Sequence, residues 1–381
     1  MHIRVAGVML IVASAAIVGA QLPDSRPFTR VLFLETSAET SANVSIGDLN
    51  GDGIADIVLA KGRHWPLIDR VLLNDGKARF AAAHDLGDTA DRSYSVTLAD
   101  IDRDGDLDVV VGNDAPDPKR VHANDGKGHF HLLSTFGRPE WPTRNATVAD
   151  LNGDKLPDII VANRTGKGMG SNFICLNKGG GQFDADCIAF SKESATTITP
   201  ADVNSDGTVD LVVPHREGGQ AYVHLNDGHA RFEKRIPFGR PDAAIRLAEV
   251  ADFNGDGRID IVAIDERRGA FIAFNEPDGT FSAPLDISND KVMPYALSVG
   301  DVNLDNKADV VVGHVKAPST VYVNDGSGRH FAPLSFGDSE GTVYGFAIGD
   351  LDRDGHPDIA VARSDARNVV YFGAPMARQA R

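Results

Sequence analysis

The sequence has little of several features that define common classes of protein. Only two of its 381 residues are cysteine, which excludes a small scaffold held together by many disulfides. Lysine and arginine number 38 against 54 aspartates and glutamates, so the formal net charge is −16 and no basic stripe favours nucleic-acid binding. After the first 20 residues, no apolar run is long enough to cross a bilayer as a helix.

Helical periodicity is also missing. After residue 20, no segment of useful length places apolar residues at the spacing of an amphipathic helix. The sequence lacks a nucleophile motif, a phosphate-binding glycine loop, a zinc motif and a haem motif as well. These absences point to an all-β protein without a common catalytic signature.

What the sequence does contain is a nine-residue motif that returns seven times at intervals of 49 to 52 residues. It reads Asp, any residue, Asn or Asp, any residue, Asp, usually Gly, two further residues, and Asp. The seven copies begin at Asp48, Asp100, Asp150, Asp202, Asp252, Asp301 and Asp350. A fixed period of this length is typical of repeat proteins.

Each period also carries four short strand patterns. An alternating segment such as 95–99 precedes the motif, and a β-branched run such as 109–111 follows it. A third segment such as 70–73 ends in Asn-Asp-Gly, which favours a hairpin turn, and a Phe such as Phe130 opens the fourth. Four antiparallel strands in each of seven periods predict an all-β fold, a seven-bladed β-propeller.

The two ends of the chain are expected to close this ring. The last period stops after its third strand, near 369–372, and Phe28 lies 20 residues before Asp48, the spacing found inside the repeats. We therefore expect residues 28–34 to supply the missing fourth strand of the last blade, which would pair edges that are otherwise open. One propeller is predicted over residues 21–381.

On these motifs the chain resembles the FG-GAP/VCBS repeat family, which includes the head propellers of integrin α-subunits. The resemblance covers about residues 28 to 373. It implies a propeller fold with calcium in each motif loop. It does not imply one activity, because propellers serve many functions.

The motif itself suits calcium, because oxygen side chains at loop positions 1, 3, 5 and 9 can converge on a hard cation. Position 6 favours Gly for its turn, but loop six has Asn306 and loop three has Lys155, where we expect weak binding or a different turn. The candidate ligands are Asp48, Asn50, Asp52, Asp56, Asp100, Asp102, Asp104, Asp108, Asp150, Asn152, Asp154, Asp158, Asp202, Asn204, Asp206, Asp210, Asp252, Asn254, Asp256, Asp260, Asp301, Asn303, Asp305, Asp309, Asp350, Asp352, Asp354 and Asp358.

We expect six or seven structural Ca²⁺ ions; regulatory and catalytic calcium are the alternatives. Strands fixed in a blade offer no bistable element for a switch. Seven Ca²⁺ ions would bring 14 positive charges and leave the full-length chain near −2, so the acidity of −16 is mostly a property of these loops.

The first 20 residues have the pattern of a secretory signal peptide. Arg4 supplies the positive charge, residues 5–18 the apolar region, and residues 18–20 a small-residue cleavage site. A membrane anchor is the alternative, but 14 apolar residues are short for a bilayer. We therefore expect a secreted or periplasmic protein without a transmembrane segment once the signal is removed.

The two cysteines, Cys175 and Cys187, flank the turn 177–183 on strands that should be neighbours. In an exported protein a disulfide that closes this hairpin is expected. Two free buried thiols are the alternative.

The face opposite the metal loops collects polar and aromatic residues at equivalent places of different blades. Five residues after each ninth-position Asp stand Lys61, Asn113, Asn163, His215, Asp265, His314 and Arg363. Six residues before each first Asp stand Ala42, Tyr94, Arg144, Thr196, Arg246, Tyr295 and Tyr344. Neighbouring loop positions hold Arg63, His64, Trp65, Trp141, Arg164, Arg216, Arg267 and Arg268.

Arginine binds carboxylate or phosphate through paired hydrogen bonds, and aromatic rings stack on sugars. The ligand surface is therefore predicted at Arg144, His215, Arg246, Tyr295, His314, Tyr344 and Arg363. Ordinary solvated or structural roles are the alternative for all of them. Glu249, in the middle of a first strand, is either a functional acid or a partner of Arg246 or of a neighbouring blade.

Three functions remain open at this point. The first is a non-enzymatic binding or adhesion module for a glycan, an anionic ligand or a protein partner. The second is a polysaccharide lyase that uses Tyr, His and Arg of the loop face. The third is a structural subunit of an envelope complex.

Overall fold

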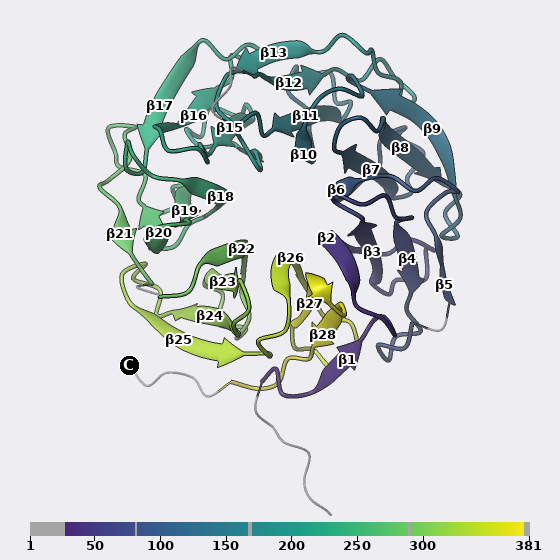
Figure 1. The fold of residues 1–381 in the computed structure, drawn as a ribbon. Coiled ribbons are helices and arrows are strands. Elements are labelled where there is room, and N and C mark those ends of the chain that lie inside the picture. Colours follow the sequence, from purple (N-terminus) through teal and green to yellow (C-terminus); the bar gives the residue numbers. More distant parts are fainter. Residues whose placement is uncertain (1–26, 81, 167–169, 289–290, 377–381) are drawn as a thin grey trace, which may run out of the picture.

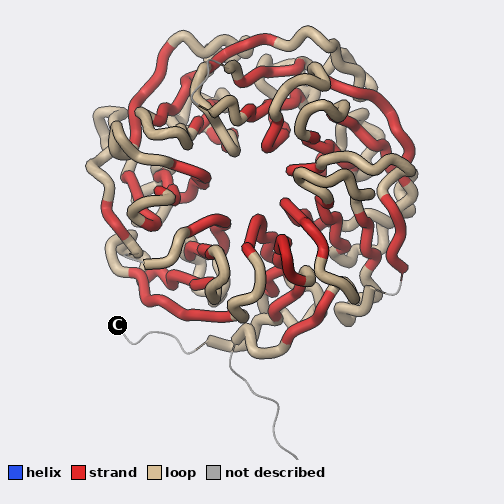
Figure 2. The backbone as a smooth tube through the Cα atoms, viewed as in Figure 1, coloured by secondary structure: helices blue, strands red, loops and turns tan. Residues whose placement is uncertain are grey.

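A computed structural model describes residues 27–80, 82–166, 170–288 and 291–376 of the chain. These residues form 28 strands and no helix, arranged in a ring around a central axis (Figures 1 and 2). The predicted signal peptide, residues 1–20, lies outside the described residues. No helix long and apolar enough to cross a membrane occurs in the described part of the chain.

Twenty of the described strands form five separate antiparallel sheets of four. In order along the chain these sheets are β6 (Ser93–Ala99), β7 (Asp108–Asn113), β8 (Lys119–Asn124) and β9 (Phe130–Phe136); β10 (Thr143–Ala149), β11 (Asp158–Asn163), β12 (Asn172–Cys175) and β13 (Ile188–Ser191); β14 (Thr199–Ala201), β15 (Asp210–Val213), β16 (Ala221–Leu225) and β17 (Lys234–Phe238); β18 (Ile245–Ala251), β19 (Asp260–Asp265), β20 (Gly269–Ala273) and β21 (Leu285–Asp286); β22 (Pro294–Gly300), β23 (Asp309–His314), β24 (Ser319–Asn324) and β25 (Phe331–Phe336).

The other eight strands join into one sheet in which both ends of the chain meet. It combines β2 (Glu39–Gly47), β3 (Asp56–Lys61), β4 (Arg70–Leu73) and β5 (Ala82–Asp85) with β26 (Thr342–Gly349), β27 (Asp358–Ala366), β28 (Val369–Tyr371) and β1 (Val31–Phe33). The two groups are linked because β2 pairs with β27 at Glu39 and Thr40. The all-β propeller fold of four-stranded antiparallel sheets is as the sequence predicts.

The segment expected to complete the last blade does pair with its third strand. Strand β1 is antiparallel to β28, with Leu32 opposite Val370. Backbone hydrogen bonds extend this pairing on both sides, from Phe28 N to Phe372 O and from Leu34 N to Asn368 O. The N-terminal strand therefore lies on the outer edge of the blade formed by the C-terminal strands (Figure 1).

The core consists of contacts between adjacent blades. The second strand of each blade is the β-branched run of the repeat, and in β7 and β23 every residue is buried. Apolar side chains of one blade pack on those of the next, as Val58 and Val71 do against Val96. Burial on both faces explains why these runs are continuously apolar rather than alternating. The Phe predicted to open each fourth strand does so in β9 and β25 but precedes β5, β13, β17 and β21.

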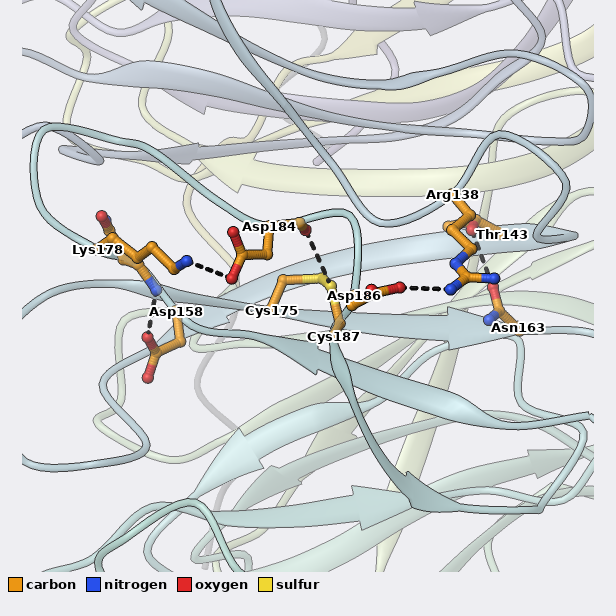
Figure 3. Close-up of a disulfide and its surroundings, with 10 residues drawn as sticks. Arg138, Thr143, Asp158, Asn163, Cys175, Lys178, Asp184, Asp186 and Cys187 are labelled. Carbon is orange, nitrogen blue, oxygen red and sulfur yellow. Dashed lines mark hydrogen bonds and ion pairs between the residues drawn. A yellow bond between two sulfur atoms is a disulfide. The ribbon is translucent and has the colours of Figure 1, made fainter.

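A disulfide joins Cys175 and Cys187, which are 12 residues apart at the facing ends of β12 and β13 (Figure 3). In the connecting loop Lys178 pairs with Asp184, and Arg138 of the preceding blade pairs with Asp186. The predicted pairing of the two cysteines is confirmed.

Reduction of this disulfide is expected to lower the free energy of unfolding by roughly 3 kcal/mol, because it releases a closed loop of about a dozen residues in the unfolded chain. Urea unfolding with and without reductant measures the difference. Thiol titration of denatured, unreduced protein should find no reactive thiol. Two reactive thiols would contradict the assignment.

Candidate functional site

Two regions hold the candidate functional residues, and they lie at opposite ends of the inner strands. The motif loops connect the first and second strands of each blade, as residues 48–55 connect β2 and β3. The second-to-third connections, such as 62–69, leave from the other end of β3. The chain therefore separates the predicted metal face from the predicted ligand face.

The seven motif loops share one backbone conformation. Positions 4 and 6 both have positive φ, as at Gly51 and Gly53 with 73° and 76°. Lys155 has a φ of 69°, and its N–H donates to Asp150 as the N–H of Gly53 does to Asp48. The turn of the third loop is therefore the same as in the others. The predicted alternative of a different turn at Lys155 is wrong, and weaker calcium binding stays a prediction.

Carboxylates converge in the second and seventh loops, where all four ligand positions are Asp. Ligand atoms of Asp100, Asp102 and Asp108 lie within 4.8 Å of one another, and the same holds for Asp350, Asp352 and Asp358. Burial, with a smaller contribution from the Asp102 carboxylate, raises the pKa of Asp108 to about 6. A donor set made of oxygens alone, crowded and negatively charged, fits Ca²⁺.

The ninth-position Asp has a second role that the motif did not reveal. In blade two, Asp108 is fully buried; its Oδ2 accepts the Ile101 N–H and its Oδ1 accepts the Asn124 N–H, both at 2.9 Å. The same pair of hydrogen bonds recurs at Asp56, Asp158, Asp210, Asp260, Asp309 and Asp358. This carboxylate ties the metal loop to the end of the third strand.

The Asn of the Asn-Asp-Gly turn links neighbouring blades. The Asn124 amide donates to the carbonyl of Leu49 in the preceding blade at 2.8 Å. Equivalent bonds are made by Asn74, Asn177, Asn226, Asn275 and Asn324. In the last blade the equivalent residue is Gly373, which has no side chain to make this bond. A larger residue would not fit there, because a Cβ atom would lie 2.3 Å from the Pro357 carbonyl oxygen. The sequence predicted a turn at these asparagines except Asn275, and it did not predict the bond between blades.

On the opposite face, a cavity of about 200 Å³ is surrounded by residues from all seven blades. The inner strands that frame it converge on the axis of the ring (Figure 1). Its lining includes the complete second predicted set: Ala42, Tyr94, Arg144, Thr196, Arg246, Tyr295 and Tyr344. Loop residues that join them are Arg63, His64, Arg164 and Arg216.

β-Bulges explain why this set faces the cavity. In β10 the pairing with β11 passes from Thr143 to Asn145 and omits Arg144. The residues omitted in the same way from the other inner strands are Ala42, Tyr94, Arg246, Tyr295 and Tyr344. A bulge leaves one residue out of the ladder and redirects its side chain, which is a common device next to binding sites.

Arginines and tyrosines stack around the cavity. The Arg246 guanidinium lies 3.3 Å from the centre of the Tyr295 ring, Arg63 lies 4.0 Å from that of Tyr344, and Arg144 lies 4.2 Å from that of Tyr94. Such cation–π contacts fix the position of each charged group while its hydrogen-bond donors remain available.

Acids at the rim balance some of this charge but not all of it. Arg144 pairs with Asp114, Arg164 with Glu217, and both Arg216 and Arg246 with Glu266. Arg63 donates to the Ser364 hydroxyl and makes no ion pair within the described residues. Burial lowers the pKa of His64, and the charges of Arg63 and Arg144 lower it further. The cavity is thus electropositive in an otherwise acidic chain.

Two tyrosines that line the cavity form a hydrogen-bonded pair. The hydroxyls of Tyr295 and Tyr344 are 3.0 Å apart. Burial raises the pKa of Tyr295, but the Arg246 charge and the bond to Tyr344 outweigh this and leave it lowered. Burial and the neighbouring Tyr295 raise the pKa of Tyr344.

Three of the predicted ligand residues lie away from the cavity lining. His314 is buried and its Nδ1 is 2.8 Å from the Pro318 carbonyl, while Arg363 is buried and pairs with Asp338 at 2.7 Å. His215 accepts the Ser194 N–H. They belong to the first predicted set, whose members tie the ends of second strands to nearby loops, so the structural alternative fits them.

The two tryptophans also differ. Trp141 stacks on Phe173, with ring centres 3.9 Å apart, and serves packing. Trp65 is 71% exposed and follows Arg63 and His64 on the connection between β3 and β4. Only Trp65 is therefore available to a partner.

A larger hollow, of about 650 Å³, lies at the outer edge of the ring beside β1 and β5. Its arginine, Arg70, is paired with Asp85, and no other arginine or histidine lines it. The outer hollow therefore lacks the cluster of positive side chains from several blades that surrounds the central cavity, and the central cavity is the stronger candidate.

Comparison with known proteins agrees with this architecture. A family model described as an FG-GAP-like repeat matches residues 48–111, 100–161, 150–213, 202–263, 252–312 and 301–361. A search of curated proteins found no match.

Solved structures with the same fold include a lectin of Agrocybe aegerita, studied for its specific recognition of non-reducing terminal N-acetylglucosamine. It is 22% identical, with a TM-score of 0.57 over 86% of this chain and 87% of that chain. A second is BBS1N in complex with ARL6DN, 15% identical, with a TM-score of 0.61 over 94% of this chain and 99% of that chain. At these identities the likeness concerns the fold, whereas the repeats tile most of the sequence, and the chain belongs to the FG-GAP-like repeat family.

Proposed function

We propose that the protein is an exported, calcium-stabilised binding module that holds an anionic group of a glycan or protein partner in its central cavity. The observation that carries this proposal is the convergence of five arginines, Arg63, Arg144, Arg164, Arg216 and Arg246, on one cavity of a chain with net charge −16. Arginine recognises carboxylate, sulfate or phosphate through paired, charge-assisted hydrogen bonds.

The electrostatics of the site support an anionic ligand. Desolvation lowers the pKa of the Arg246 guanidinium to about 10, so its charge is held at a cost that an anion would offset. Arg63 donates only to a hydroxyl, and its Nε is buried without a hydrogen-bond partner, so the guanidinium retains donor capacity for an anion. The fold of a lectin and of a protein-binding propeller is compatible with either kind of partner.

Calcium is proposed as the stabilising ion of the opposite face. The motif side chains at positions 1, 3, 5 and 9 would hold it, and the carboxylates already converge in the second and seventh loops. Bound there, the ion would neutralise the carboxylates of each loop and make their close approach favourable. No role in ligand chemistry is assigned to it.

Replacing Arg63 with alanine is expected to weaken binding of an acidic oligosaccharide by roughly ten- to hundredfold, the value of a hydrogen bond to a charged group. An array of uronate-containing and sulfated glycans identifies the probe, and titration calorimetry measures the loss. The matched control is Arg79→Ala on the metal face, where Arg79 pairs with Asp75 in solvent. Unchanged binding by the Arg63 and Arg246 variants would contradict the proposed site.

A lyase is the second candidate, and the lowered pKa of Tyr295 beside Arg246 is the observation that favours it. A tyrosine that loses its proton readily can act as a base, while arginine neutralises the uronate. New unsaturated sugar ends after incubation with acidic polysaccharides, absent with Tyr295→Phe, would favour the enzyme over the binding module.

A further inference from the structure

In the first four blades, the inner strand carries a hydroxyl group that bonds to the next blade. Ser45 donates from its hydroxyl to the Val96 carbonyl at 2.8 Å, and Thr97 to the Ala146 carbonyl at 2.6 Å. Thr147 and Thr199 repeat this bond to Ile198 and Ala248. All four donors stand three residues before the first Asp of their motif.

The fifth blade has Glu249 at this position, whereas the sixth has Ser298 and the seventh Ala347, so Glu249 is the one ionisable residue among the seven. By the same spacing, the carbonyl that a hydroxyl here would reach is that of Leu297, which lines the cavity together with Glu249. An ionised carboxylate has no hydrogen to donate to a carbonyl. Glu249 therefore cannot perform the structural task of the four hydroxyls in its ionised form, which suggests another use.

Glu249 also lacks the partner expected from the sequence. Its nearest arginine in the chain, Arg246, instead donates to the Tyr295 carbonyl and pairs with Glu266. Within the described residues no hydrogen bond or ion pair involves the Glu249 carboxylate, and desolvation alone raises its pKa to about 7. A desolvated carboxylate without donors is costly, and a ligand that donated hydrogen bonds to it would relieve that cost.

We propose that Glu249 makes the central cavity selective for an acidic sugar, whose anionic group binds the arginines and whose hydroxyls donate to Glu249. This inference rests on the proposed function, since it concerns the same cavity. A simple anion would leave Glu249 without a hydrogen-bond donor, whereas a sugar acid offers its anionic group to the arginines and its hydroxyls to Glu249. The cavity of about 200 Å³ is of a size for one ring, as cavities of about 150 Å³ hold benzene.

The test compares two acids of equal charge and similar ring size, methyl glucuronoside and cyclohexanecarboxylate, which differ in their hydroxyl groups. Their affinities are measured by calorimetric or NMR titration on the wild-type protein, Glu249→Thr, Glu249→Gln and Arg63→Ala. The Thr variant is suited to folding, because threonine already stands at this position in three other blades, at Thr97, Thr147 and Thr199. Thermal melts of each variant verify that it is folded.

The wild type should bind the sugar acid roughly ten- to hundredfold more tightly than the hydroxyl-free acid. Glu249→Thr should remove most of that preference by weakening the sugar acid alone, and Glu249→Gln should retain part of it. Arg63→Ala should weaken both acids. Equal affinities in the wild type, or equal losses for both acids in Glu249→Thr, would overturn the role of Glu249 while leaving the anion site standing. Failure of both acids to bind the folded wild type would overturn the proposed function and this inference with it.

Discussion

Adding millimolar Ca²⁺ to protein stripped with a chelator is expected to raise its melting temperature by at least about 10 °C. A site filled at a hundredfold excess over its dissociation constant contributes about 2.7 kcal/mol to stability. Six or seven such sites together would exceed the total stability of an ordinary domain, which is about 5–15 kcal/mol. Without the ion, sets such as Asp100, Asp102 and Asp108 hold converging carboxylates that repel one another.

Melting curves across a calcium titration measure this effect, and Mg²⁺ is the control ion. Because Mg²⁺ demands tighter octahedral geometry and keeps its waters, its effect should be smaller. Asp206→Ala and Asp256→Ala should cost more stability in calcium than Asp154→Ala, since Lys155 brings a positive charge to the third loop. Equal melting temperatures in chelator and in calcium would exclude structural calcium.

Asp108→Ala is expected to lower the free energy of unfolding by about 3–5 kcal/mol, beyond any loss of calcium. The substitution removes the acceptor of two N–H groups, those of Ile101 and Asn124, and both residues are buried away from solvent. Urea unfolding in one calcium-containing buffer measures the cost.

The control for this prediction is Asp104→Ala in the same loop. Asp104 is exposed and accepts a hydrogen bond from the neighbouring Asp106 N–H, so its loss concerns the cation and the loop alone. The excess loss in Asp108→Ala therefore isolates the link between the loop and the third strand. Equal losses for the two variants would show that the ninth position matters only as a ligand.

The position of each residue within the repeat predicted the fold well, because the strands, the turn and the metal motif recur together at a fixed spacing. The pairing of 28–34 with the last blade followed from the spacing of Phe28 to Asp48, and the disulfide from the placement of two cysteines across one hairpin. The spacing also predicted that Arg144, Tyr295 and their equivalents would meet, which they do at the cavity.

The position within the repeat could not distinguish residues that line the cavity from residues that have structural contacts. His314 and Arg363 stand at equivalent places in the repeat, yet His314 contacts the Pro318 carbonyl in the loop after it, and Arg363 pairs with Asp338 in the connection between β25 and β26. The direction of a side chain at a strand end depends on bulges and loop contacts, which leave no pattern in one sequence. Regular alternation would place Arg246 and Glu249, three residues apart, on opposite faces of the strand. The bulge at Arg246 changes this, so both residues line the cavity, yet Arg246 pairs with Glu266 and not with Glu249.

The bulges at the cavity have an evolutionary consequence. Each redirected residue lies outside the pairing between the first and second strands, as Arg144 and Tyr344 do. A substitution at such a position changes the chemistry of the pocket while the hydrogen-bonded ladder and the packing between blades stay in place. Selection can therefore act on recognition at six separate points, each in a different blade, without passing through unstable intermediates, and a single scaffold can serve unrelated partners.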